Sequence, residues 1–387
     1  MILHILHAVE MIALVGTFSS VVYYLLCLWS AANFLRARRS ADKSVRATPA
    51  SVSMLKPLKG IDPGMYESLR SQCRQEYPEY EIIFGVSDAA DPAAELVRQL
   101  QSEFPERAIR LKVCDKNLGA NTKVSNLAQM LTDARHENII VSDSDIRVEP
   151  DYLRRVIGPL GDPKIGLVTC LYRGIAATTL SSRLESLGIS TDFAPGVLVA
   201  RQIESGIRFG LGSTLAFRRR DLAAIGGFEA IADYLADDYE LGKRIAGLGL
   251  KVSLSEIVVE TFLPAYSFSE FLRHQLRWAR TIRDARRGGY FGLLLTFGFF
   301  WSLVAVAASH AAAWAWGLLA LTACVRSTMA LVVGQCTLRD SNVLRWLWLI
   351  PARDLLSVPV WLVGLGGGTI SWRGKKLQLN DGKLTLF

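Results

Sequence analysis

The chain has 387 residues, is 50% hydrophobic and carries a formal net charge of +8. The apolar excess over an ordinary soluble domain is concentrated in residues 11–35 and beyond residue 290, which predicts membrane segments. The stretch between them, about 220–250 residues long, is sufficient for one large α/β domain. Six cysteines without a CxxC pair exclude a zinc site or a disulfide framework and indicate a reducing compartment.

The first apolar segment, Met11–Leu35, contains no charged residue. As a helix its roughly 25 residues span about 37 Å, more than the hydrocarbon core of a bilayer requires. The flank that follows is basic, unlike the flank of a cleaved signal peptide, and contains Arg36, Arg38, Arg39, Lys43 and Arg46. The positive-inside rule therefore predicts an uncleaved anchor with an external N-terminus and a cytoplasmic domain after it.

The distal half contains two further predicted spans, Tyr290–Trp316 and Leu318–Leu338. Arg326 lies inside the second span, so it must face protein or extend to the membrane surface. Leu355–Ile370 is shorter and contains four glycines, so it is either a short span or a re-entrant segment. The basic tail after it favours the cytoplasm, and the number of crossings stays open.

Residues 50–260 alternate short apolar runs with amphipathic stretches. The predicted strands are Ser51–Leu55, Glu81–Val86, Ile109–Val113, Asn138–Val141 and Ile165–Leu171. The helical patterns between them are Met65–Glu76, Pro92–Phe104, Ala120–Ala134 and Asp151–Ile157. This alternation predicts an α/β fold with a mostly parallel sheet, which binds ligands beyond the carboxyl ends of its strands.

Carboxylates follow two of these strands. Asp88 comes just after Glu81–Val86, and Asp143 and Asp145 form a D-x-D pattern after Asn138–Val141. Two carboxylates at a strand end can hold Mg²⁺ or Mn²⁺, which keeps its other coordination positions for diphosphate oxygens. The alternative is a solvated turn that caps the next helix.

Two other polar elements point to the same chemistry. Lys123 falls in the first turn of a predicted helix, where a cation can meet a phosphate held at the helix N-terminus; the alternative is a surface lysine. Asp237 and Asp238 are adjacent carboxylates before an amphipathic helix. Their mutual repulsion and partial burial should raise one pKa, as a general base requires, whereas the alternative is simple N-capping.

The segment Phe268–Arg287 combines apolar residues at helical spacing with six arginines. It directly precedes a predicted span, so we expect it to lie among lipid headgroups as an amphipathic interfacial helix. Because its basic residues accompany a membrane entry, nucleic acid is not the expected partner. The helix contains the sequence Gln275-Leu-Arg277-Trp278.

The order of these motifs resembles that of the inverting, lipid-directed and processive glycosyltransferases of family 2 type, although Q-L-R-W is one residue shorter than their Q-x-x-R-W. Further motifs are similar to the ceramide glucosyltransferase family, and these are Leu55–Gly60 with Asp62 and Pro63, Val86–Pro92, Asp143–Val148 and Gln275–Trp278. The resemblance covers residues 10–370. It implies a GT-A-type nucleotide-sugar-binding domain with N-terminal and C-terminal transmembrane helices.

The resemblance also implies roles for single residues. Asp88 matches the carboxylate that holds the nucleoside, while Asp143 and Asp145 match the nucleotide and metal positions, with Mg²⁺ or Mn²⁺ as the cofactor. Asp238 matches the catalytic base. The residues that would position donor and acceptor are Asp237, Gln275, Arg277 and Trp278. The implied partners are a UDP-sugar, a lipid acceptor and the membrane.

The segment Thr191–Ala200 looks more like the bacterial hopanoid-biosynthesis glycosyltransferases of the same family. The expected reaction is therefore inverting transfer of N-acetylglucosamine or glucose from a UDP-sugar to a lipid hydroxyl, first of bacteriohopanetetrol and alternatively of ceramide. A processive polysaccharide synthase would need more membrane helices. A dolichol- or undecaprenyl-phosphate glycosyltransferase would not carry the Leu55–Gly60 motif, and a non-catalytic receptor would not need these carboxylates.

The expected organisation has five parts. They are an anchor over 1–35, a cytoplasmic catalytic domain over 36–265, an interfacial helix over 266–289, a transmembrane region over 290–370 and a tail over 371–387. The expected location is the bacterial inner membrane.

Overall fold

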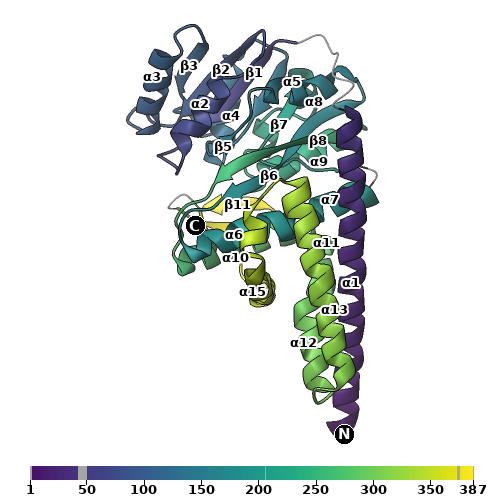
Figure 1. Cartoon of the computed structure of the whole chain (residues 1–387). Helices are drawn as coiled ribbons and strands as arrows, with labels where there is room; N and C mark the ends of the chain where they lie inside the picture. Colours follow the sequence, from purple (N-terminus) through teal and green to yellow (C-terminus); the bar gives the residue numbers. More distant parts are fainter. Residues whose placement is uncertain (1, 42–49, 205, 373–374, 387) are drawn as a thin grey trace. The chain divides into compact units, whose positions relative to one another are not determined.

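The computed structural model describes residues 2–41, 50–204, 206–372 and 375–386 (Figure 1). They form two compact units. The helical unit contains Met1–Arg36, Thr178–Val199 and Ala265–Ser371. The sheet unit contains Ala37–Ala177, Ala200–Pro264 and Trp372–Phe387. Thr178–Val199 thus groups with the membrane segments, and the C-terminal tail groups with the sheet.

The sheet unit is built on an eight-stranded sheet in the order β3-β2-β1-β4-β7-β6-β8-β5. The strands are β1 (Val52–Pro57), β2 (Tyr80–Val86), β3 (Ala108–Val113), β4 (Asn138–Val141), β5 (Ile146–Arg147), β6 (Ile165–Ile175), β7 (Leu215–Arg218) and β8 (Lys251–Phe262). All five predicted strands are present. The strands β5, β7 and β8 were not predicted.

The two halves of the sheet differ in strand direction. In the first half β1 pairs in parallel with both β2 and β4, and β2 pairs in parallel with β3, as expected. The second half is mixed: β7 is antiparallel to β4 and β6, β6 is parallel to β8, and β5 is antiparallel to β8. Because β2 and β4 flank β1 in the same direction, the loops after these two strands open at one edge of the sheet.

Amphipathic helices cover the sheet and bury their apolar stripes against it. They are α2 (Met65–Cys73), α3 (Ala93–Glu103), α4 (Thr122–Leu131), α5 (Tyr152–Ile157), α8 (Arg219–Ala224) and α9 (Asp237–Gly247). In α3, for example, Val97 and Leu100 are fully buried in the core beside Phe84 of β2. Burying one such side chain contributes about 1.5–3 kcal/mol.

The helical unit contains the membrane candidates. Its elements are α1 (Ile2–Ala41), α6 (Leu180–Gly188), the π-helix η2 (Ile189–Phe193), α10 (Phe268–Ala285), α11 (Arg287–Gly292), α12 (Gly298–Ala308), α13 (Ala313–Ala330), η5 (Leu331–Thr337), α14 (Asn342–Arg345) and α15 (Ile350–Gly364). The helix α7 (Ala194–Ile203) runs from this unit into the sheet unit. Among the described residues three helices are long and apolar enough to cross a membrane, or four if one bent pair counts as a span.

The predicted span Tyr290–Trp316 is not one helix. It is divided into Arg287–Thr296 and Gly298–Ala308, which meet at an angle of 49°. The chain then turns at His310 and Ala311, both with positive φ, and Trp314 and Trp316 belong to α13. At the bend a side chain on Gly298 would come within 2.8 Å of the Tyr24 hydroxyl of α1, so a glycine allows this close approach.

Arg326 of α13 is buried inside the helical unit, as its place in an apolar segment requires. Its guanidinium donates to both carboxylate oxygens of Asp354, at 2.9 and 2.7 Å, and to Asp192 Oδ1 at 2.6 Å. It also lies 5.6 Å from the ring centre of Tyr24. Of the two predicted alternatives, Arg326 therefore faces protein rather than extending to the membrane surface.

Candidate active site

The segment after β1 joins the two carboxylate loops of the sheet unit. The backbone N–H of Gly60 donates to Asp91 Oδ1 at 2.9 Å in the loop after β2. Ser144 Oγ, in the loop after β4, donates to Asp62 Oδ2 at 2.7 Å. Since β1 lies between β2 and β4, its loop reaches both neighbours, which gives the Leu55–Gly60 motif and its following Asp62 a structural role.

Lys56 lies beneath the D-x-D pair and is fully buried. Its ammonium donates to Ser142 Oγ at 2.9 Å and to the carbonyl oxygen of Asp143 at 2.6 Å. Burial lowers the pKa of Lys56 to about 8, although Asp143 and Asp145 act in the opposite direction. In the sequence Lys56 stands out only as a member of the Leu55–Gly60 motif, and no role was predicted for its side chain.

Lys123 lies in the first turn of α4, as predicted, and joins two of the predicted loops. Its Nζ is 2.8 Å from Asp143 Oδ1 and 3.1 Å from Asp237 Oδ2. Burial opposes its charge, but Asp143 and Asp237 outweigh this and raise the pKa of Lys123 above its ordinary value. The alternative of a surface lysine is wrong, because only 18% of the side chain is exposed.

Asp238 is the second residue of α9 and is held by two backbone donors. The N–H of Gly212 donates to Oδ2 at 2.7 Å, and the N–H of Tyr239 donates to Oδ1 at 2.8 Å. Burial and the neighbouring Asp237 raise the pKa of Asp238 to about 6, with Lys123 opposing them. The N-cap of α9 is Ala236, so neither aspartate is simply the N-cap.

Gly212 lies against two of the predicted carboxylates. A Cβ atom at this position would come within 2.8 Å of Asp143 Oδ2 and 3.3 Å of Asp238 Oδ2. A glycine therefore leaves the room in which Asp143 and Asp238 approach each other. No motif of the sequence singled this glycine out.

Asp145 completes the D-x-D pair. Its Oδ2 accepts a hydrogen bond from Thr261 Oγ1 of β8 at 2.6 Å. Burial and the charge of Asp143 raise the pKa of Asp145 to about 6. Asp143 and Asp145 supply carboxylate oxygens, the donors that Mg²⁺ and Mn²⁺ prefer. Among the described residues no group of three or more Asp, Glu, His or Cys side chains is arranged to hold an ion, so the two carboxylates would leave the other coordination positions to the donor's diphosphate.

Asp88 lies at the end of β2, as predicted, and is exposed. Its Oδ1 accepts a hydrogen bond from the N–H of Ala90 at 2.9 Å, within its own turn. The structure thus brings Lys123, Asp143, Asp237 and Asp238 into one cluster, with Asp145 next to it, and places Asp88 on the neighbouring loop.

The other predicted residues lie on α10 in the helical unit. Gln275 is buried, and both ends of its amide are bonded: Nε2 donates to Glu185 and Oε1 accepts from Arg353 Nη2 at 2.8 Å. Trp278 packs on Phe193, with ring centres 5.8 Å apart. Gln275 therefore fixes α10 to α6 and α15, and Arg277 lies between these two residues on the same helix.

Two arginines of α10 contact the end of α15. Arg283 Nη1 donates to the carbonyl oxygens of Gly364 and Gly367, both at 2.9 Å, and Arg280 donates to that of Thr369. These contacts satisfy carbonyls that a helix C-terminus leaves unpaired. Part of the positive charge of this helix thus serves the fold rather than lipid headgroups.

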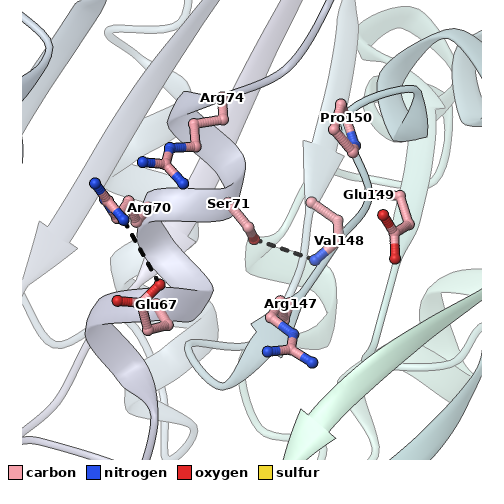
Figure 2. A pocket seen from close by; sticks show the side chains of 8 residues that line it. All are labelled: Glu67, Arg70, Ser71, Arg74, Arg147, Val148, Glu149 and Pro150. Atoms are coloured by element: carbon pink, nitrogen blue, oxygen red, sulfur yellow. Dashed lines mark hydrogen bonds and ion pairs between the residues drawn. The ribbon is translucent and has the colours of Figure 1, made fainter.

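A pocket of about 280 Å³ lies elsewhere in the sheet unit, and Figure 2 shows the side chains that line it, among them Arg70, Arg74 and Arg147. Arg70 pairs with Glu103 at 2.5 Å, and Arg147 pairs with Glu260. Its arginines are thus already paired, and none of the predicted site residues lines it. It is not the candidate site.

Curated proteins of similar sequence include ceramide glucosyltransferases. Ceramide glucosyltransferase 3 from Caenorhabditis elegans is 26% identical over 230 residues, 59% of this chain and 50% of the relative. Ceramide glucosyltransferase 1 from the same organism is 27% identical over 209 residues, 54% of this chain and 44% of the relative. The chain thus spans about half the length of these curated relatives.

Among solved structures, mannosyltransferase PcManGT from Pyrobaculum calidifontis, in complex with GDP-Man and Mn²⁺, matches with a TM-score of 0.55 and 19% identity. The match covers 92% of this chain and 97% of that one, and it confirms the GT-A-type fold. The family model described as "Glycosyl transferase family 21" matches residues 12–385. The chain therefore belongs to glycosyl transferase family 21.

Proposed function

We propose that the protein transfers a sugar from a UDP-sugar to the hydroxyl group of a membrane lipid with inversion at the anomeric carbon. The observation that carries this proposal is the cluster around Asp238. This carboxylate is oriented by two backbone donors, has a raised pKa, and lies beside the D-x-D loop and Lys123. A carboxylate in this state can take a proton from an alcohol near neutral pH.

Each residue of the cluster has a defined part in the reaction. Asp238 accepts the proton of the lipid hydroxyl as that oxygen attacks the anomeric carbon. Lys123 supplies positive charge next to Asp143 and Asp237, where a departing diphosphate gains negative charge. Asp143 and Asp145 would hold Mg²⁺ or Mn²⁺, which neutralises charge on the leaving UDP as a Lewis acid. Asp88, on the adjacent loop, would contact the nucleoside.

For the lipid acceptor, the comparisons favour ceramide, which was the alternative to the expected bacteriohopanetetrol. The two curated relatives reported above carry the name ceramide glucosyltransferase, so they favour the ceramide alternative over the hopanoid acceptor.

Activity assays with defined lipids test the proposal. The purified enzyme would be given UDP-glucose or UDP-N-acetylglucosamine together with ceramide, bacteriohopanetetrol or undecaprenyl phosphate. We expect glycolipid formation with ceramide as the preferred acceptor and none with the lipid phosphate. Formation of a polymer without any lipid acceptor would instead favour a processive synthase. Such a synthase would need more membrane helices than the three or four candidate spans of the described residues.

We also propose that the sheet unit faces the cytoplasm, in a bacterial inner membrane. Arg36, Arg38 and Arg39 stand at the end of α1 and support this orientation. Lys43 and Arg46, which belong to the same basic cluster, lie outside the described residues.

Removal of divalent metal is expected to abolish transfer. Excess EDTA should remove the ion that Asp143 and Asp145 would hold, and added Mn²⁺ or Mg²⁺ should restore the rate. Glycolipid formation measured before and after this addition checks the prediction. Full activity in EDTA, with trace metal excluded, would show that Lys123 and the other protein groups suffice for the leaving group.

Replacing Lys56 with methionine is expected to weaken metal-dependent UDP binding by about tenfold or more. The change removes a buried donor to Ser142 and to the carbonyl of Asp143, and an unsatisfied buried group costs about 1–3 kcal/mol. Calorimetric titration with UDP and Mn²⁺ measures the effect. Lys112→Met is the matched control. Lys112 lies on the edge strand β3 and pairs with Asp133, so the change removes a paired lysine that has no contact with the D-x-D loop among those described. Equal UDP affinity in both variants would contradict the role of Lys56.

A further inference from the structure

The C-terminal tail is part of the same unit as the catalytic carboxylates. Its strands β10 (Lys375–Asn380) and β11 (Lys383–Leu386) form a hairpin within the described residues. The N–H of Leu384 donates to the carbonyl of Asp233 at 2.7 Å, and the N–H of Leu235 donates to that of Gly382 at 3.0 Å. A folded unit lies on one side of a membrane, so the tail and the carboxylates share a side.

This shared side restricts the number of crossings. The region Ala265–Ser371 begins and ends next to segments of the sheet unit, so it must cross the membrane an even number of times. It contains three candidate segments, namely the bent pair, α13 and α15. We propose that only the first two cross, as a hairpin, and that α15 lies in the membrane interface along α10, with its exposed apolar face toward the acyl chains of that leaflet.

The bent pair and α13 have the contacts of a transmembrane hairpin against α1. Tyr24 of α1 donates to the carbonyl of Thr296, and Gly16, two turns nearer the N-terminus, faces Trp301, so α12 runs toward the N-terminal end of α1. The chain turns after Ala308, and α13 brings Arg326 back to the level of Tyr24. In Figure 1 α1, α12 and α13 run side by side.

The helix α15 runs along α10, and it also meets the hairpin, where Asp354 accepts from Arg326 and Trp361 packs on Phe297. Arg353, near the start of α15, bonds to Gln275, and Gly364, at its end, accepts from Arg283. The two contacts are separated by about 12 Å along α10 and by about 16 Å along α15, so the two helices run side by side in the same direction. Figure 1 shows α15 nearly end-on, across the direction of α1, α12 and α13. A helix that lies along an interfacial helix lies in the interface itself.

The side chains of α15 fit this position. The exposed ones on one face are apolar, namely Leu355, Leu362 and Val363, with Leu365 at the C-cap. Arg353 points to the opposite face, where it is buried against Gln275. The segment Leu347–Gly364 also has the lowest mean hydropathy of the three long candidate helices. One apolar face and one polar face are typical of a helix at a membrane surface.

Cysteine labelling tests the number of crossings. Single cysteines would replace Glu95, Ala313 and Thr385, all exposed, in a protein whose six native cysteines are removed. An impermeant maleimide applied to intact cells should label Ala313→Cys, at the hairpin turn. Glu95→Cys, in the sheet unit, and Thr385→Cys, in the tail, should react only after permeabilisation. Labelling of Glu95→Cys and Thr385→Cys from opposite sides would overturn the proposal.

Depth measurements test the position of α15. Nitroxide labels at Leu355→Cys and Leu365→Cys in reconstituted vesicles report membrane depth through their accessibility to oxygen and to a polar nickel complex. The two positions should have the same shallow depth, although they are separated by about 15 Å along the helix. A difference close to that length would show that α15 crosses. Neither measurement requires sugar transfer, so both remain informative if the proposed function fails.

Discussion

Asp238→Asn is expected to lower turnover by roughly 10²–10⁴-fold while UDP affinity stays nearly unchanged. The amide has the same size as the carboxylate and cannot take the proton of the acceptor hydroxyl. Its oxygen can still accept the hydrogen bond from Gly212, so the loop that contains Gly212 should be retained, while its NH2 group gives up the hydrogen bond from Tyr239. The rate of glycolipid formation and the calorimetric affinity for UDP, measured on one preparation, separate catalysis from binding.

Asp88→Asn is the comparison variant, because Asp88 is the carboxylate expected to contact the nucleoside. It is exposed and bonds only within its own turn among the contacts described above, so its replacement should leave the fold intact. We expect weaker UDP binding and a smaller loss of turnover at saturating donor. If Asp238→Asn loses UDP affinity as severely as Asp88→Asn, or keeps near-normal turnover, then Asp238 is not the base.

Asp237 is the next candidate in that event, and the structure distinguishes it from Asp238. Its Oδ2 lies 3.1 Å from the ammonium of Lys123, whereas the two oxygens of Asp238 accept hydrogen bonds from the backbone N–H groups of Gly212 and Tyr239. This difference is the reason to assign the proton transfer to Asp238.

The position of the carboxylate loops could be predicted from the sequence. Apolar runs that end in Asp88 and Asp143 identify strands of a parallel sheet, and the carboxyl ends of such strands share an edge. The strands β7 and β8 escaped prediction for a local reason. Leu215–Arg218 runs directly into three consecutive arginines, Arg218–Arg220, and the burial of β8 does not alternate regularly along its 12 residues. The strands with which β7 and β8 pair lie far away in the sequence, so their pairing is determined only in the folded sheet.

Contacts between distant parts of the chain escaped prediction for a different reason. Lys56 and Asp143 are separated by 87 residues, and Gln275 and Arg353 by 78. No periodicity or spacing in the sequence reports such pairs. The sequence predicted that Arg326 either faces protein or extends to the membrane surface, because a charge in an apolar segment needs one or the other, but it could not identify Asp192 and Asp354 as its partners.

The glycines of the site are the clearest case in which local rules mislead. Gly242 lies inside α9, where helix propensity alone predicts that alanine would stabilise the protein by about 1 kcal/mol. In the structure a Cβ atom at this position would lie 2.1 Å from the backbone nitrogen of Gly210 and 2.4 Å from the carbonyl carbon of Phe209. Both are main-chain atoms, so no rotation of a side chain relieves the overlap.

Gly242→Ala is therefore expected to destabilise the protein by about 1–3 kcal/mol and to remove most of its activity. The loop that must move contains Gly210, whose N–H donates to the carbonyl of Asp238, and Gly212, whose N–H holds the Asp238 carboxylate. Gly247→Ala, at the end of the same helix, is the matched control, since a Cβ atom there meets nothing within 4 Å. Thermal unfolding and the rate of transfer, measured for both variants, decide the matter. If Gly242→Ala is as stable and as active as Gly247→Ala, then α9 does not pack against this loop, and the orientation of the base must come from contacts other than Gly210 and Gly212.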